Sequence, residues 1–301
     1  MCGRDGEHFV KSKTKIWLGA GAFVVAGVSG APAETPSLGR AAARERLSDI
    51  ALAQALSWRT DFSAAKMHQH AAPAKQGGEG GEAGSQQGEL PPDLDFALKI
   101  AQIRGHLLVG DELIKEGQWA AALPHFLHPG EELYGPIRGR LKDYNTPPFA
   151  TALKLLATTV KQKKGGDDYA NALKSVEDAL AAADAGVKAK QASEGFAVET
   201  ALELLKSATN EYQQAIVKGR IVKPVEYQDS RGFVWQSEKM IEALSATLEK
   251  KDAAALKAVR AGFAELKKAW PAATPPKTPV KDYAAVLSDV SRIELSIGKL
   301  M

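Results

Sequence analysis

The feature that most constrains the fold is a helical spacing of apolar residues that runs from residue 93 almost to the C-terminus. In the first segment Phe96, Ile100, Ile103 and Leu107 recur three or four residues apart, which places them on one face of an α-helix. Helical segments are predicted at 93–116, 119–127, 130–142, 148–163, 167–187, 194–218, 224–249, 252–269 and 280–298. No useful length of sequence alternates apolar and polar residues as a half-buried strand does. The sequence therefore predicts an all-α protein made of one or two antiparallel helical bundles.

Helix ends are marked by residues that stop or start a helix. Asp93 is predicted to cap the first helix and Gly117 to end it. Longer breaks are predicted at the Gly- and Pro-rich stretches 163–168, 217–224 and 270–279, because these residues cannot continue a helix without cost.

A weak internal echo suggests two halves. Shifting the sequence by about 100 residues lays 115–137 on 217–240, so that Gly117 meets Gly219. Each half would then be a long helix, a glycine turn, a short piece ending in an aromatic residue, and a second long helix. Few residues are identical between the two segments, so a single bundle without an internal repeat is the alternative.

The N-terminal 33 residues have the pattern of a secretory signal peptide. Three lysines precede the apolar run 16–28, and small residues follow up to Ala33, which predicts cleavage after Ala33. The run is too short to span a bilayer comfortably, although an uncleaved membrane anchor is the alternative. Localisation in the periplasm is the expectation.

The rest of the chain divides by composition. Residues 34–71 are compatible with a helical segment, and 72–92 are rich in Gly, Gln, Glu and Pro. Such a stretch buries too little surface to offset its ordering entropy, so it is predicted to be a flexible linker. The helical-bundle domain is expected to occupy 93–301.

Charge and cysteine content exclude several kinds of partner and site. Without residues 1–33 the chain has 35 basic and 34 acidic side chains, a balance that gives no reason to expect nucleic acid. The single cysteine, Cys2, would leave with the signal peptide. The exported protein would therefore have no disulfide and no thiolate ligand.

One short stretch, residues 122–136, gathers candidate metal ligands. His125 and His128 are three residues apart, as two ligands on one helix face can be, and Glu131 and Glu132 follow a Pro-Gly pair. Imidazoles with carboxylates suit iron, zinc or copper better than magnesium or calcium. The alternative is a polar turn in which the glutamates cap the next helix and the histidines bond locally.

A further histidine lies on the first long helix. His106 has Gly105 and Gly110 beside it, and small residues let another helix approach closely. His106 is therefore a candidate ligand in a site between helices. Asp111 and Glu112 lie on other faces of that helix and are not expected to share the site.

A third cluster, Met67, His68 and His70, precedes the linker. Thioether and imidazole ligands suit copper. Because the cluster directly precedes a segment predicted to be flexible, it would form at most a low-affinity site or a site for metal transfer.

Common catalytic and cofactor motifs are missing from the sequence. It contains no HExxH, CxxCH, GxSxG, GxxxxGK[ST] or GxGxxG pattern. No catalytic nucleophile is proposed, and the protein is not expected to be an enzyme.

The segment 204–244 contains a spaced pattern made of Tyr212, Ala215, Gly219, Ile221, Glu226, Tyr227 and Phe233. With this pattern the segment resembles the extracytoplasmic region of the high-affinity iron permease family. The first half looks more like imelysin-like periplasmic iron-uptake proteins, which carry a GxHxxE-type metal motif. Here Val109 stands where the glutamate after His106 would be.

The resemblance implies a stand-alone periplasmic domain that binds or delivers a metal, most often iron, with a membrane permease or periplasmic protein as partner. It adds Glu226 and Tyr227 to the candidate ligands, although a carboxylate at a helix start and a buried tyrosine have structural explanations too. A metal-free interaction module is the alternative, in which aromatic residues near the helix breaks contact a partner. Those aromatic residues are Trp119, Tyr134, Trp235 and Trp270.

Overall fold

The computed structural model describes residues 90–301. The predicted signal peptide, the helical segment 34–71, the cluster Met67, His68 and His70, and nearly all of the linker lie outside the described residues. The α-helices are α2 (Pro92–Lys115), α3 (Trp119–His128), α4 (Tyr134–Ile137), α5 (Ala150–Lys161), α6 (Asp167–Lys190), α7 (Glu194–Ala215), α8 (Pro224–Ala243), α9 (Ser245–Leu266) and α10 (Tyr283–Ile297). Shorter helical turns are the π-helix η2 (Pro129–Leu133) and the 3-10 helices η3 (Leu141–Tyr144) and η4 (Lys267–Ala269).

The all-α prediction is confirmed, with one small addition. The predicted break between α7 and α8 contains a two-stranded antiparallel hairpin, β1 (Ile216–Val217) and β2 (Arg220–Ile221). Gly219 in its turn has a φ of 72°, and Gly117 after α2 has a φ of 76°. Both glycines that the internal echo pairs therefore adopt the left-handed conformation that glycine favours.

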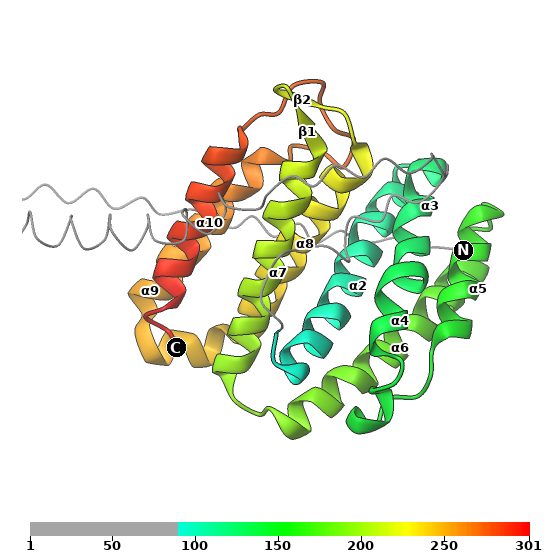
Figure 1. Ribbon diagram of the computed structural model, residues 1–301, viewed down its shortest axis with the longest axis horizontal. Helices are drawn as coiled ribbons and strands as arrows, with labels where there is room; N and C mark the ends of the chain where they lie inside the picture. The colour runs from blue at the N-terminus through cyan, green and yellow to red at the C-terminus, as the bar shows by residue number, and fades with distance from the viewer. Residues whose placement is uncertain (1–89) are drawn as a thin grey trace, which may run out of the picture. The chain divides into compact units, whose positions relative to one another are not determined.

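Two hydrophobic cores lie on either side of a central layer. Figure 1 shows α2, α7 and α8 in the middle, with α9 and α10 on one side and α3 to α6 on the other. One core is formed mainly by α7 to α10, and the second by α2 to α6. Helix α2 contributes Leu98 to the first core and Phe96 and Ile103 to the second. It is therefore buried on two faces, not one.

Glycines bring α2 and α8 into close contact. A Cβ on Gly232 of α8 would collide with the carbonyl oxygen of Gly105 in α2, and a Cβ on Gly105 would collide with the ring of Phe233. Gly110, five residues further along α2, lies against Phe126 and His125 of α3. The prediction that small residues beside His106 admit a neighbouring helix is thus confirmed, and two helices approach there.

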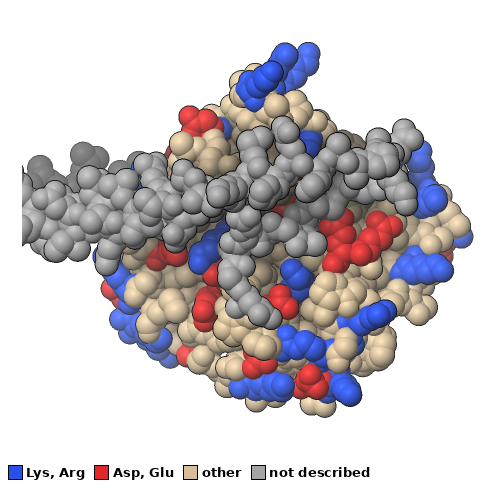
Figure 2. Space-filling model, viewed as in Figure 1, with Lys and Arg blue, Asp and Glu red and all other residues tan. Residues whose placement is uncertain are grey.

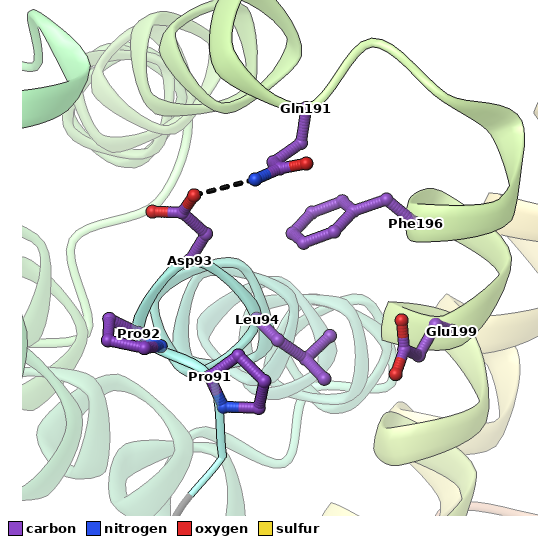
Figure 3. A pocket seen from close by; sticks show the side chains of 7 residues that line it. All are labelled: Pro91, Pro92, Asp93, Leu94, Gln191, Phe196 and Glu199. Carbon is purple, nitrogen blue, oxygen red and sulfur yellow. Dashed lines mark hydrogen bonds between the residues drawn. The ribbon is translucent and has the colours of Figure 1, made fainter.

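The start of α2 differs from the prediction. Pro91 is the N-cap residue, and Asp93 does not cap the helix. The Asp93 carboxylate instead accepts hydrogen bonds from the Tyr144 hydroxyl at 2.5 Å and the Gln191 amide at 2.7 Å. Figure 3 shows Asp93 reaching toward Gln191 at the rim of a pocket of about 290 Å³, into which Leu94 and Phe196 also project. These bonds tie the start of α2 to η3 and to the end of α6.

Two other helix predictions need correction. The single helix expected at 130–142 is a π-helix, a short α-helix and a 3-10 turn. The break expected between 249 and 252 is a kink at Asp252, which has φ −157° and ψ 96°. Its carboxylate accepts a hydrogen bond from the Ala255 amide at 2.9 Å, so the chain restarts a helix there as a capped helix does.

Lys and Arg side chains alternate with Asp and Glu over the face seen in Figure 2, and cations project at the end where Figure 1 draws β1 and β2. Within residues 90–301, none of the helices combines the length and the apolar character that crossing a membrane requires.

Candidate metal centre

Three helices each place one polar side chain at a common point in the interior. His106 comes from the middle of α2, His125 from α3 and Asp229 from the first half of α8. The glycine contacts described above set the spacing of these helices. Because α2 touches both α3 and α8 at glycines, side chains one turn away are brought within reach of one another.

The two imidazoles meet a single carboxylate oxygen. Nδ1 of His106 and Nδ1 of His125 each lie 2.7 Å from Oδ1 of Asp229. One ligand atom from each of the three residues can be chosen so that all lie within 4.8 Å of one another. Two donors bonded to one ion at about 2.1 Å each are at most about 4.2 Å apart. Small side-chain movements would therefore allow the three atoms to share an ion.

The centre is shielded from water. His106 and His125 are 0 % exposed and Asp229 is 2 % exposed. Burial by itself would raise the pKa of Asp229, but His106 and His125 beside it hold the pKa of that carboxyl well below its usual range. Asp229 is therefore a carboxylate at neutral pH, and a buried anion of this kind needs positive charge close by.

His128 forms the outer edge of the centre. Its Nδ1 is 3.6 Å from Oδ2 of Asp229, and its ring lies edge-on to that of His106 at 5.5 Å between centroids. At 9 % exposure it is the least buried of the three histidines. Burial lowers the pKa of His128, but Asp229 and the charge of Glu132 outweigh that effect and raise it.

The π-helix η2 begins directly after His128. Such wide turns are uncommon and are often found at functional sites. Glu132, on η2, is partly buried and close enough to His128 to affect its charge. Glu131 is exposed and lines a separate pocket with Tyr134 and Lys154. Of the two predicted glutamates, Glu132 is thus the one placed toward the histidines.

A second layer of polar contacts surrounds the ligand atoms. Oε1 of Gln228 lies 3.0 Å from Nε2 of His125, and the Gln228 amide nitrogen donates to the carbonyl of Ala273 at 3.2 Å. His106 also packs edge-on against Phe233, with 5.2 Å between ring centroids. His125 therefore has polar contacts at both ring nitrogens.

The remaining acidic residues of α2 do not enter the centre, as expected from their spacing. Asp111 accepts a hydrogen bond from Tyr169 at 3.1 Å and pairs with Lys115. Glu112 makes a two-bond ion pair with Arg231, with nitrogen to oxygen distances of 2.7 and 2.9 Å.

Glu226 and Tyr227, which the resemblance added, lie elsewhere. Glu226 is in the first turn of α8, where Lys223 donates to it at 2.9 Å. Tyr227 is fully buried in the core of α7 to α10, and its hydroxyl donates to the carbonyl of Ala272 at 3.1 Å. Both contacts match the structural explanations left open for these residues.

The aromatic residues suggested for a partner contact pack within the protein. Trp270 is 1 % exposed and lies edge-on to Tyr212. Trp235 is covered by the Arg231 guanidinium, 4.0 Å above its ring. Trp119 packs against Tyr169 and Tyr134 against Phe149. These contacts give the four residues a structural role.

Asp229 and Gln228 were missed from the sequence. Both lie in the run from Glu226 to Val234, which is buried on every side of α8 although it contains Gln, Asp, Ser and Arg. Polar residues in a fully buried helix must each find a partner. No histidine lies near Asp229 in sequence, and the nearby Glu226 pairs with Lys223. Local sequence therefore carries no signal that the partners of Asp229 come from about 100 residues upstream.

The donor set has a recognisable chemistry. Two imidazoles and one carboxylate suit ferrous iron and zinc, and this combination leaves positions on the ion open. Enclosure by three helices fixes the ligand positions and limits access of water to the site. Such a site can hold a transition-metal ion without a thiolate.

Comparison with known proteins gives one match. Residues 188–301 match the family model described as the iron permease-associated 4-helix bundle domain. The match covers α7 to α10 and contains the segment 204–244, so the resemblance of that segment to the iron permease family is confirmed. Residues 90–187 lie outside the match. A comparison with curated proteins and with solved structures finds no match to the chain.

Proposed function

We propose that this protein binds a transition-metal ion, with iron as the physiological ion, at the centre formed by His106, His125 and Asp229, and that it serves an iron uptake system. The observation that carries the proposal is the convergence of two Nδ1 atoms on one buried carboxylate oxygen, at 2.7 Å each. An oxygen and two imidazole nitrogens in this arrangement are ready to exchange their mutual contacts for bonds to one ion.

The donor set and the family match both bear on the identity of the ion. The donor set accepts ferrous iron, zinc and copper. The domain contributing Asp229 is similar to one associated with iron permeases. Together they favour iron as the cargo.

Delivery is the role that fits best with such a site. In this proposal residues 1–33 direct export of the chain to the periplasm. There the protein stores or carries the ion and transfers it to a membrane permease. His128, 3.6 Å from Asp229, and Glu132 are less buried than the three ligands, so we expect an ion to enter and leave past these two residues.

Metal binding by purified protein tests the proposal. We expect the wild-type chain to bind about one ferrous ion per molecule under anaerobic conditions, and also zinc. Asp229→Asn keeps the side-chain shape but removes the negative charge and one ligand oxygen, so bound metal should fall at least tenfold. Metal content after desalting and a competition titration with a chelator measure both quantities.

A double variant, His68→Ala with His70→Ala, is the matched control, because it removes the same number of histidines as His106→Ala with His125→Ala. We expect the control to retain its metal and the second pair to lose it, with circular dichroism confirming that both fold. Equal metal content in wild type and Asp229→Asn would contradict the proposal.

A further inference from the structure

We propose that Gln228 is a positioning residue that holds His125 with a proton on Nε2 and so makes Nδ1 the metal-binding atom. This inference rests on the proposed metal site and specifies how one of its ligands is prepared. It follows from three contacts that run from a loop carbonyl to the carboxylate of Asp229.

The first step is the orientation of the Gln228 amide. Its nitrogen lies 3.2 Å from the carbonyl oxygen of Ala273, which can only accept a hydrogen bond. Turning the amide over would place two acceptor oxygens against each other. The amide oxygen must therefore face His125, from which it is 3.0 Å away.

The second step concerns the histidine ring. An amide oxygen is an acceptor only, so Nε2 of His125 must carry the hydrogen in that contact. A neutral imidazole then has its lone pair on Nδ1. That lone pair points at Oδ1 of Asp229 from 2.7 Å, and two acceptors at this distance repel unless a proton or a metal ion lies with them. Nδ1 is thus the atom that can exchange a proton for a metal.

The third step is the rigidity of the support. Ala273 is fully buried. Side chains of α8 also donate hydrogen bonds to two backbone carbonyls that precede Ala273 in the same loop. Tyr227 donates to the carbonyl of Ala272 at 3.1 Å, and Arg231 donates to that of Trp270 at 2.7 Å. The loop after η4 is therefore fixed to α8 by three side chains. Partners outside the ligand sphere that orient a histidine in this way commonly contribute tenfold to hundredfold in metal affinity.

Two substitutions at Gln228 separate orientation from packing. Gln228→Met fills similar space but offers Nε2 only a weakly accepting sulfur, whereas Gln228→Glu still presents an oxygen that accepts a hydrogen bond from Nε2. We expect Gln228→Met to weaken zinc binding about tenfold to hundredfold. Gln228→Glu loses the bond to Ala273 but keeps the acceptor for Nε2, so it should bind zinc more tightly than Gln228→Met. Gln236→Met, at another buried glutamine of α8, is the matched control and should leave the affinity within twofold.

Nitrogen-15 spectra of the histidine rings provide a readout that a general loss of packing would not reproduce. In the zinc-loaded wild type, His125 should show a proton on Nε2 and zinc on Nδ1. The same Nε2 proton should be seen in the metal-free protein, lost in Gln228→Met and retained in Gln228→Glu.

The outcomes distinguish this inference from the metal site itself. If the wild type binds zinc and Gln228→Met binds it equally well, or if zinc is found on Nε2, the inference is wrong and the metal site stands. If the wild type binds no metal, the proposed function is wrong. The spectra of the metal-free protein then decide the positioning role separately, since loss of the Nε2 proton only in Gln228→Met would support it and any other pattern would overturn it.

Discussion

At the scale of single residues, Arg231 shows how α8 keeps polar groups in the interior. Its guanidinium makes two bonds to Glu112, donates a third to the carbonyl of Trp270 and covers the ring of Trp235. This use of the planar guanidinium needs an arginine, because a lysine ammonium cannot form the paired bonds or stack in the same way.

Arg231→Lys should therefore lower the free energy of unfolding by about 1–3 kcal/mol, the range for hydrogen bonds to charged groups that lose a partner. Urea denaturation followed by circular dichroism measures the change. The matched control is Arg260→Lys, since Arg260 makes the same two-bond pair with Glu242 but on the surface. Exposed ion pairs contribute little to stability, so equal effects of the two substitutions would contradict this account of Arg231.

The sequence predicted single residues unevenly. His106, His125 and His128 are candidates from the sequence because imidazole is uncommon and its spacing is informative, and the structure brings all three close to Asp229. Asp229 and Gln228 were not, because carboxylates and amides are common on helices. Their meaning depends on which helix packs against them, and packing between residues about 100 positions apart cannot be read from local patterns.

At the scale of helices, the contact of α2 with α8 depends on Gly105 and Gly232. Gly232→Ala would place a methyl group against the Gly105 carbonyl and force the helices apart. We expect a loss of about 1–3 kcal/mol in stability, as for other overpacked interiors. Because the same contact sets the distance from His106 to Asp229, metal affinity should fall as well.

Gly195→Ala is the control for this prediction. Gly195 lies in the first turn of α7, where an added Cβ meets nothing within 4 Å, and alanine favours helix more than glycine does. This variant should be as stable as wild type or more so. Denaturant midpoints and chelator competition for both variants provide the measurement, and a Gly232→Ala protein with unaltered stability would show that the contact tolerates a side chain.

Helix positions followed well from the sequence where glycine and proline mark the ends. The prediction was wrong at 129–144. There the turn after His128 is widened into the π-helix η2, which contacts α5, and the 3-10 helix η3 contacts α6. Sequence periodicity describes one helix at a time. It carries no information on where tertiary contacts deform a helix.

At the scale of the whole molecule, buried tyrosines should make the fold sensitive to alkaline pH. Burial raises the pKa of Tyr212 to about 12, and burial also raises the pKa values of Tyr144, Tyr169 and Tyr227. A raised pKa means that the folded state holds the proton more tightly than the unfolded state. The resulting stability is complete below a pH of about 10 and is lost as the pH rises toward about 12.

Denaturation of wild type and Tyr212→Phe at several pH values between 8 and 12 tests this for Tyr212, which donates to the carbonyl of Lys281 at 2.6 Å. Wild type should be the more stable below pH 10, and its advantage should shrink as the pH rises. Absorbance at 295 nm follows ionisation directly. A constant difference between the two proteins across this range would exclude a raised pKa for Tyr212.

The proposed ligands come from two different portions of the chain, and neither portion supplies the whole set. The imidazoles belong to residues 90–187, and the carboxylate and the amide belong to the portion similar to the iron permease-associated domain. By itself the second portion supplies an aspartate and a glutamine but no histidine to face them. The proposed metal site is therefore complete only where both portions are present, and each portion restricts which substitutions the other can accept.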